Sequence, residues 1–221
     1  MAYEWDFAIV LENLPVLLRG LGVMLQLWLS ALAFGLAAGF VIALGRMAAA
    51  APLRLLARCY VELFRNTPAL IQLIWFYYAF PIVIGVQLTP FAAAVIGLSL
   101  NTSAYAAEIF RGGMQAVPRG QWEGASALGM THAAVLRRVV LPQVLRLMLP
   151  AFTNRAIELA KTTSLASVLA VQELMYQGRL LSATYYRPME ILTTVALIYF
   201  MVIWPGSLLS AWLERRLARH G

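Results

Sequence analysis

Long apolar runs separated by short polar segments dominate this chain. No charged residue falls between Gly20 and Gly45, between Asn66 and Ala107, or between Ile191 and Leu213. A helix that crosses a bilayer needs roughly 20 apolar residues, so each run can hold at least one span. The middle run is long enough for two spans. Its segment FPIVIGVQLTP, with two prolines and a glycine, predicts the turn between them.

A fifth apolar stretch, residues 147–171, is interrupted by Arg155, Glu158 and Lys161. We count it as a span, because charged residues inside a membrane helix usually face other helices or a water-filled path. The pattern therefore predicts an all-α membrane protein, a single domain over residues 1–221, with five transmembrane helices. Their approximate bounds are 20–45, 58–81, 88–110, 147–171 and 190–213.

The first residues, MAYEWDF, carry acids where a cleaved signal peptide would carry positive charge. The segment YEWDFAIVLENLPVLLRG instead predicts an amphipathic stretch at the membrane face, with Trp5 at the interface. Composition agrees with a membrane protein, because 62% of residues are hydrophobic and 12% are charged, against about a quarter charged in soluble domains. Cys59, His132 and His220 are the only cysteine and histidines, which argues against an internal disulfide and a multi-ligand Cys/His metal site.

The net charge of +7 is explained by orientation. If the segment after the first span is cytoplasmic and the sides alternate, eleven arginines lie inside and three lie outside, a clear positive-inside bias. We therefore expect no nucleic-acid partner, an outside N-terminus and a cytoplasmic C-terminus. The inside set is Arg46, Arg54, Arg58, Arg111, Arg119, Arg137, Arg138, Arg146, Arg215, Arg216 and Arg219, and the outside set is Arg19, Arg179 and Arg187.

Residues 112–146 form the one substantial cytoplasmic loop, and local signals predict two helices in it. Pro118 can open a helix over residues 121–128, and Gly129 suits the left-handed residue that ends one. Thr131 can cap the next helix, which Pro142 would break or kink.

Small residues at 124–127 leave one side of the first loop helix nearly smooth, so that another protein could approach it closely. Glu123 stands near the start of this helix, where the helix dipole favours an acid. The alternative is a surface helix that rests on the lipid headgroups.

The loop also carries a motif. Glu123, Gly124, Ala125, Gly129 and residues 139–142 (VVLP) follow the spacing E-A-A, three residues, G, nine residues, I-x-L-P. This resembles the signature loop of permease subunits of ATP-binding-cassette (ABC) importers, with Gly for the first Ala and Val for Ile. Four segments, residues 60–73, 101–130, 141–150 and 161–174, are further similar to the polar amino-acid permeases, which serve histidine, glutamate, glutamine, arginine and opines.

The resemblance implies the type I importer permease fold and makes this loop helix the coupling helix, which seats in a groove of a separate ATPase. The coupling residues are then Gln121, Trp122, Glu123, Gly124, Ala125, Leu128, Gly129 and Met130. A P-loop needs a Gly-Lys pair, but the only lysine, Lys161, follows Ala160. We therefore expect no enzyme activity and no cofactor in this chain, and ATP and Mg²⁺ in the partner ATPase.

Four polar residues inside the spans are predicted to bind substrate: Glu62, Asn101, Lys161 and Thr162. The resemblance places Glu62 near the pocket. The alternative for Glu62 is an ion pair with Arg65, three residues further along the helix. The Asn101 amide can bond a substrate amino acid or a neighbouring helix. The run from Lys161 to Ser164 covers every side of a helix, which suggests local unwinding or a water-lined cavity. Thr162 stands where the family often has an aspartate. The loss of this acid argues against a strongly cationic substrate.

Two other charged pairs occur in or near the spans. Glu108 and Arg111 are expected to form a structural pair at three-residue spacing. Arg155 and Glu158, charged inside a span, are candidates for a functional role; the alternative is that Glu158 is neutralised by Arg155 or Lys161. His132 is expected on the loop surface, and Pro68 is expected to kink the second span.

The resemblance thus implies the permease of an ATP-driven importer for polar amino acids, in a bacterial inner membrane and in contact with its lipid. Its partners would be ABC ATPase subunits, a second permease chain (in a homodimer or heterodimer) and an extracytoplasmic substrate-binding protein. A free-standing channel or ion-driven carrier is the main alternative. An intramembrane enzyme and a scaffold that only recruits a partner are the others.

Overall fold

The computed structural model describes residues 3–218, and every regular element in that range is a helix. The elements in chain order are α1 (Ala8–Glu12), α2 (Leu14–Met47), α3 (Ala51–Arg65), α4 (Ala69–Ile74), the π-helix η1 (Trp75–Ala79), α5 (Phe80–Ile84), α6 (Pro90–Ala116), α7 (Arg119–Ala127), α8 (His132–Val135), the π-helix η2 (Leu136–Val140), α9 (Leu141–Thr162), the 3₁₀-helix η3 (Thr163–Leu169), α10 (Leu174–Tyr185) and α11 (Pro188–Ala218).

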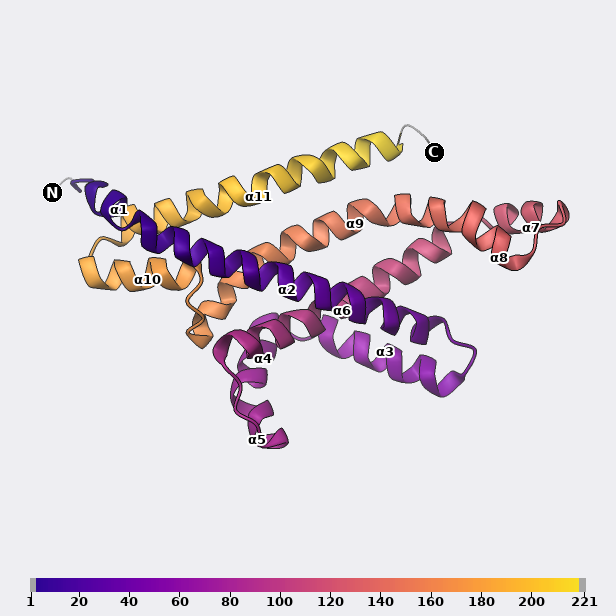
Figure 1. The fold of residues 1–221 in the computed structure, drawn as a ribbon, viewed down its shortest axis with the longest axis horizontal. Helices are drawn as coiled ribbons and strands as arrows, with labels where there is room; N and C mark the ends of the chain where they lie inside the picture. Colours follow the sequence, from indigo (N-terminus) through magenta and orange to yellow (C-terminus); the bar gives the residue numbers. More distant parts are fainter. Residues whose placement is uncertain (1–2, 219–221) are drawn as a thin grey trace.

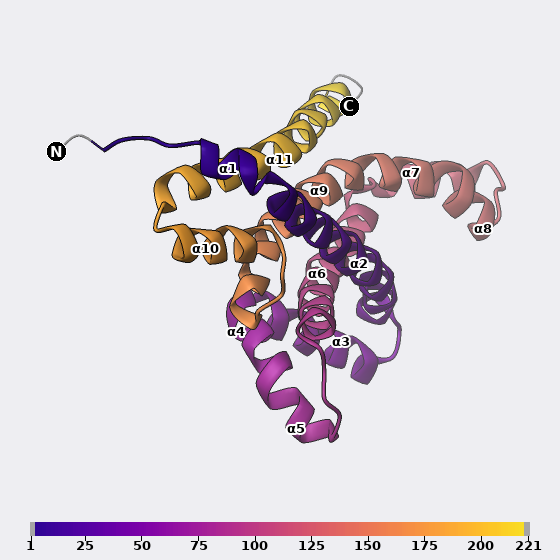
Figure 2. The same ribbon diagram turned by 60° about the vertical axis from the view of Figure 1, so that its left-hand side comes forward.

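The long helices run roughly side by side along the longest axis of the molecule (Figure 1). Helices α2, α6 and α9 lie between α11 on one side and α4 with α5 on the other, as Figure 2 shows from a second direction. Within the described residues, α2, α6 and α11 are long and apolar enough to cross a membrane, and the bent pair formed by α3 with α4–α5 adds a fourth if its two halves are one span. The all-helical membrane fold is therefore confirmed. The fifth span stays a prediction, because α9 carries too many charges to qualify by composition.

Helix α2 meets α6 at very close range because small residues line the contact. Gly35 and Gly39 form a G-x-x-x-G pair on the buried side of α2. A Cβ atom added at Gly39 would lie 2.5 Å from the Cβ of Ala106 and 2.8 Å from the carbonyl oxygen of Ser103. Such small-residue contacts let membrane helices gain dispersion energy without a hydrophobic driving force from water. This contact sets the position of α6, which carries most of the polar side chains described below.

The two sets of arginines expected on opposite sides of the membrane lie at opposite ends of the helix bundle. The ends of α2, α6 and α11 and the whole α7–α8 loop gather at one end, whereas α1, α10 and the start of α11 gather at the other (Figure 1). Arg46, Arg215 and Arg216 lie in the last turns of their helices at the first end. Arg219, counted with them, lies outside the described residues.

Residues 3–7 form no regular element, and α1, which follows, has only five residues. Glu190 of α11 holds this first segment by accepting hydrogen bonds from the Tyr3 hydroxyl (2.6 Å) and the Asp6 amide (3.0 Å). Two local expectations need correction. The second span is broken at residues 66–68, rather than kinked, with an angle of 104° between its halves.

At Pro142 the helix neither stops nor restarts. Helix α8 continues through the π-helical turn η2 directly into α9, and Pro142 occupies the first turn of α9. The wider π-helical turn precedes the proline immediately, and a helix that re-satisfies its backbone in this way tolerates proline.

Candidate functional site

The loop between α6 and α9 has the local structure that its signals predict. Helix α7 begins just after Pro118, which lies one position earlier than expected, as the N-cap residue. Gly129 adopts the left-handed conformation (φ +78°) directly after the helix, and the Thr131 hydroxyl accepts a hydrogen bond from the Ala134 amide at 3.4 Å. His132 opens α8 on the surface, and its ring stacks on Trp122 with the centroids 5.8 Å apart.

Only one side of α7 packs against the rest of the protein. Ala125 is buried with Val135 and Val140, and Trp122 and Met130 pack against this same small cluster. The opposite side consists of exposed residues, and Leu128 at its tip is 84% exposed. A Cβ added at Gly124 would meet no other atom within 4 Å. Helix α7 is thus held by a narrow strip and offers a mostly exposed surface that includes Gln121, Glu123, Gly124, Leu128 and Gly129.

A network of polar side chains, which we call the Arg155 network, lies inside the helix bundle. The buried Arg155 of α9 donates from Nη2 to Asn101 Oδ1 at 2.7 Å and to Thr102 Oγ1 at 3.1 Å, both on α6. Its guanidinium carbon lies 4.2 Å from the centroid of the Tyr105 ring. Nη1 of Arg155 pairs with Glu158 Oε2 at 3.4 Å, as the spacing predicts. Arg155 therefore neutralises Glu158 and also joins α9 to α6.

Asn101 extends the Arg155 network to the break between α3 and α4. Its amide Nδ2 donates to Gln72 Oε1 (3.0 Å) and to the Phe64 carbonyl (3.2 Å). Gln72 in turn donates to the carbonyls of Phe64 (2.9 Å) and Thr67 (3.1 Å). In a membrane, backbone groups freed by a broken helix need such partners. The buried amides of Asn101 and Gln72 thus stabilise the bend.

A second cluster, the Glu108 cluster, lies further along the same side of α6. Glu108 accepts ion pairs from Arg111 (2.7 Å), Arg46 of α2 (3.0 Å) and Arg65 of α3 (3.8 Å). The expected pair of Glu108 with Arg111 is present, whereas Arg65 turns to Glu108 instead of Glu62. The guanidinium of Arg65 also lies 5.4 Å from the Tyr105 ring centroid, on which Arg155 stacks. Tyr105 therefore links the Glu108 cluster to the Arg155 network.

The four residues predicted to bind substrate fall into three places. Asn101 is buried inside the Arg155 network, where both ends of its amide bond neighbouring helices. Glu62 is exposed on α3 and accepts a hydrogen bond from Asn66 Nδ2 at 3.0 Å. Lys161 and Thr162 end α9 where the chain changes to 3₁₀-helix, so the polar run does mark a local change of helix type. The Thr162 hydroxyl donates to the Glu158 carbonyl at 2.7 Å.

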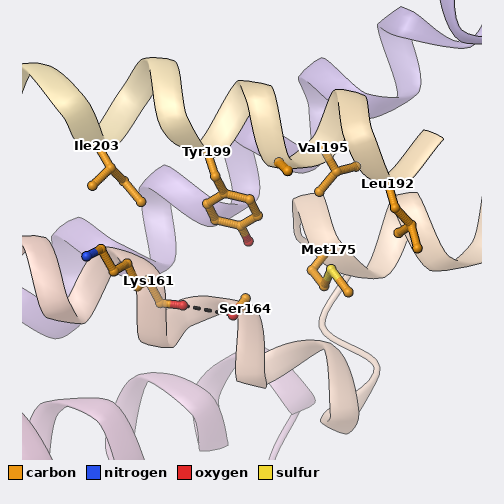
Figure 3. A pocket seen from close by; sticks show the side chains of 8 residues that line it. Lys161, Ser164, Met175, Leu192, Val195, Tyr199 and Ile203 are labelled. Carbon is orange, nitrogen blue, oxygen red and sulfur yellow. Dashed lines mark hydrogen bonds between the residues drawn. The ribbon is translucent and has the colours of Figure 1, made fainter. Parts of the chain in front are cut away.

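Lys161 is exposed and borders a hollow of about 390 Å³. Ser164, Met175 of α10 and an apolar side of α11 complete its lining, and Tyr199 projects from α11 toward Ser164 (Figure 3). Among the described residues Lys161 forms no ion pair. Its ammonium group is therefore available to a carboxylate that enters this hollow.

Sequence reasoning missed Gln72 and the role of Tyr105. Gln72 is one of the few amides in the long uncharged run, and a buried amide in a membrane helix is itself a signal for a bonded partner.

In the described part of the chain, no group of three or more His, Cys, Asp or Glu side chains lies close enough to hold a metal ion.

Comparison with known proteins gives consistent matches. Residues 35–220 match the family model described as the inner membrane component of binding-protein-dependent transport systems. The chain is 39% identical to the L-cystine transport system permease protein TcyB of Bacillus subtilis, over 99% of this chain and 93% of that protein. It is 33% identical to the glutamate/aspartate import permease protein GltK of Escherichia coli, over 98% of this chain and 100% of that protein.

Two solved structures of ABC transporters contain chains with a similar fold. A crystal structure of an amino acid ABC transporter with histidines contains a chain that is 37% identical, with a TM-score of 0.89 and coverage of 97% of this chain and 100% of that one. The MetNI methionine ABC transporter in an inward-facing conformation shares the fold at 20% identity, with a TM-score of 0.70 and coverage of 91% and 98%.

Proposed function

We propose that this chain, which belongs to the family of inner-membrane components of binding-protein-dependent transport systems, forms the membrane pathway of an ATP-driven importer for polar amino acids. The named substrates of its relatives, cystine and glutamate or aspartate, support this class of substrate. Its relatives are permease subunits, so the chain is a transport subunit and not the ATPase. They do not favour the alternative of a free-standing channel or ion-driven carrier.

The single observation that carries the proposal is the exposed side of α7. A short helix held only through Trp122, Ala125 and Met130 presents Glu123 and Leu128 outward. Gly124 leaves this side without a side chain, so another protein can approach the helix closely between Glu123 and Leu128. We assign this surface to a groove of the ATPase, where ATP and Mg²⁺ are bound. Closure of two ATPase subunits would then move the two copies of α7 and, through α6 and α9, the membrane helices.

The remaining partners follow from this role. A second permease chain, identical or similar, would complete the pathway, and an extracytoplasmic binding protein would deliver the substrate. The gathering of arginines at the α7–α8 end of the molecule supports a cytoplasmic position for that end. The N-terminus would then lie outside and the C-terminus in the cytoplasm of a bacterial cell.

The substrate path is assigned to Glu62, Asn101, Lys161 and Thr162. Lys161, with no ion pair to another described residue, is suited to the substrate carboxylate, and the exposed Glu62 is suited to its ammonium group. Asn101 would act through the position of α6, because its amide is occupied by Gln72 and Arg155.

Charge reversal at Glu123 tests the proposal. We expect Glu123→Arg to abolish ATP-dependent uptake while the chain still inserts in the membrane, because the substitution places a long cation in the docking surface. The exposed Ala133 of α8 offers a control, Ala133→Arg, which adds the same side chain nearby. Uptake should be measured in vesicles that contain the complete transporter, together with co-purification of the ATPase. Normal uptake by Glu123→Arg would contradict the proposal that α7 couples the ATPase to transport.

A further inference from the structure

The end of the molecule that carries the α7–α8 loop contains a pocket rich in arginine. A hollow of about 410 Å³ opens between the end of α2, the start of α3 and the end of α6. Its charged lining consists of four arginines, Arg46, Arg54, Arg58 and Arg111, beside Gln115 and Leu55. Four guanidinium groups around one hollow repel one another strongly unless anions compensate them.

The protein supplies only part of that compensation. Glu108 pairs with Arg46 and Arg111, and it also pairs with Arg65, which lies outside the pocket. Arg54 donates to two neutral groups, the carbonyls of Ala48 (2.9 Å) and Ala49 (2.6 Å).

Two groups of the lining have donors left over. Within the described residues, Arg58 forms no ion pair or hydrogen bond, and Arg46 Nη1 is buried without a hydrogen-bond partner. The exposed Arg58 therefore has donors free for an anion that enters the pocket, and the unsatisfied Arg46 Nη1 lies buried beneath the pocket surface.

The surroundings of the pocket indicate which anion it takes. Arg46 lies in the last turn of α2, one residue after the uncharged run from Gly20 to Gly45. The guanidinium groups therefore lie at the depth of lipid headgroups. On α3, Leu55 lines the pocket and is 61% exposed, and Leu53 and Leu56 on the other side of the same helix are 49% and 69% exposed. A ligand with a phosphate and long apolar chains satisfies both the arginines and these leucines.

We propose that this pocket binds the headgroup phosphate of an anionic phospholipid, with the acyl chains along the leucines of α3. Arginine matches the geometry of phosphate oxygens because it donates in a planar fork. The bound phosphate would add a further link between α2, α3 and α6, beside the ion pairs of Glu108, the hydrogen bond of Tyr60 with Ser103 and the buried cluster of Ala43, Val61 and Ala107. Occupancy would then hold α3 against α6 and affect the rate at which these helices move during transport.

The test measures binding of phosphatidylglycerol, and of phosphatidylcholine as the neutral reference, to the full chain in detergent by native mass spectrometry. Arg58→Gln is the test variant, because Arg58 supports no contact in the described structure and its loss should not affect folding. Arg138→Gln on η2 is the matched control, since it removes an equally exposed arginine at the same end but outside the pocket. We expect Arg58→Gln to weaken phosphatidylglycerol binding about fivefold, the usual effect of one arginine near anionic lipid, and Arg138→Gln to leave it unchanged.

Several outcomes would overturn the proposal. Equal weakening by the two substitutions would indicate diffuse surface charge and not a pocket. Binding of phosphatidylcholine as tight as that of phosphatidylglycerol would remove the role of the arginines. Displacement of the lipid by millimolar inorganic phosphate would assign the pocket to a soluble phosphate compound. In vesicles, uptake that rises with the fraction of phosphatidylglycerol in the wild type, and less steeply in Arg58→Gln, would support the lipid.

Discussion

The Arg155 network and the α7–α8 loop are built in opposite ways. In the network, buried side chains of three helices far apart in sequence bond to one another, and Asn101 bonds both Gln72 of α4 and Arg155 of α9. In the loop, each turn is fixed by one local signal, such as Gly129 or Thr131, and one side of α7 touches nothing else in the described chain. The network holds its shape through bonds between residues far apart in sequence, whereas the turns of the loop are set by adjacent residues, and α7 rests on a small apolar cluster that also contains residues of α6 and α9.

This difference suits the two tasks we assign. A surface that docks on another protein must keep its form when the membrane part changes, so local signals are the right foundation. A pathway that opens and closes needs helices that move together, which requires bonds between them. Substitutions in the network should therefore affect the whole protein, and substitutions in the loop should affect only the loop.

The largest effect is expected at the α2–α6 contact on which the network depends. Gly39→Leu would place side-chain atoms where Ala106 and the Ser103 carbonyl already lie. Because backbone borders the contact on both helices, we expect a loss of at least about 3 kcal/mol and little folded protein by size-exclusion chromatography. The control is Gly22→Leu on the same helix, where an added Cβ meets no atom within 4 Å. Similar losses in the two variants would show that the close contact is not special.

The next effect is expected at Asn101. Asn101→Leu would remove the donor to Gln72 Oε1 and one of the two acceptors of the buried Arg155 Nη2, at a cost of roughly 2 kcal/mol. The thermal unfolding temperature of the whole chain should fall. Asn66→Leu makes the same chemical change at an exposed amide beside the α3–α4 bend; water can replace its two hydrogen bonds to Glu62, so the cost should be smaller, about 0.5 kcal/mol. If the two variants unfold alike, the network is not a unit.

A smaller and local effect is expected in the loop. Gly129→Ala forces a residue with a Cβ into a left-handed conformation, which costs about 1 kcal/mol. Hydrogen exchange of the α7 amides should become faster while the unfolding temperature of the chain stays the same. Gly124→Ala should slow the hydrogen exchange of the α7 amides, because the position has room for a methyl group and alanine favours helix. A lower unfolding temperature in Gly129→Ala would contradict the independence of the loop.

The smallest effect is expected at Thr131. Its hydroxyl caps α8 through a long hydrogen bond of 3.4 Å at an exposed site. We expect Thr131→Ala to cost about 0.5 kcal/mol, at the low end for a lost helix cap, and to increase exchange only in α8. Thr131→Ser keeps the hydroxyl and should match the wild type. An effect of Thr131→Ala on the exchange of α6 or α9 would mean that the two regions are coupled.

The same contrast explains what the sequence can predict. The turn at Gly129 and the cap at Thr131 depend on residues next to one another, so a pattern reveals them. The partners of Asn101 lie 29 and 54 residues away, and nothing in a local pattern connects them. Glu108 illustrates the same limit, because its spacing from Arg111 predicts one ion pair but not those with Arg46 and Arg65. The substrate residues were chosen by resemblance and polarity, and these signals do not distinguish exposed Lys161 from buried Asn101.

The break between α3 and α4 has a mechanical consequence. Arg65 fastens the end of α3 to Glu108, and Gln72 fastens α4 to Asn101, so α6 grips the two arms of the bend at separate points. The arms lie at 104° to each other. We expect a movement of α6 parallel to α3 to displace α4 nearly perpendicular to the axis of α4. The bend would in this way convert a movement along one helix into a sideways movement of the next.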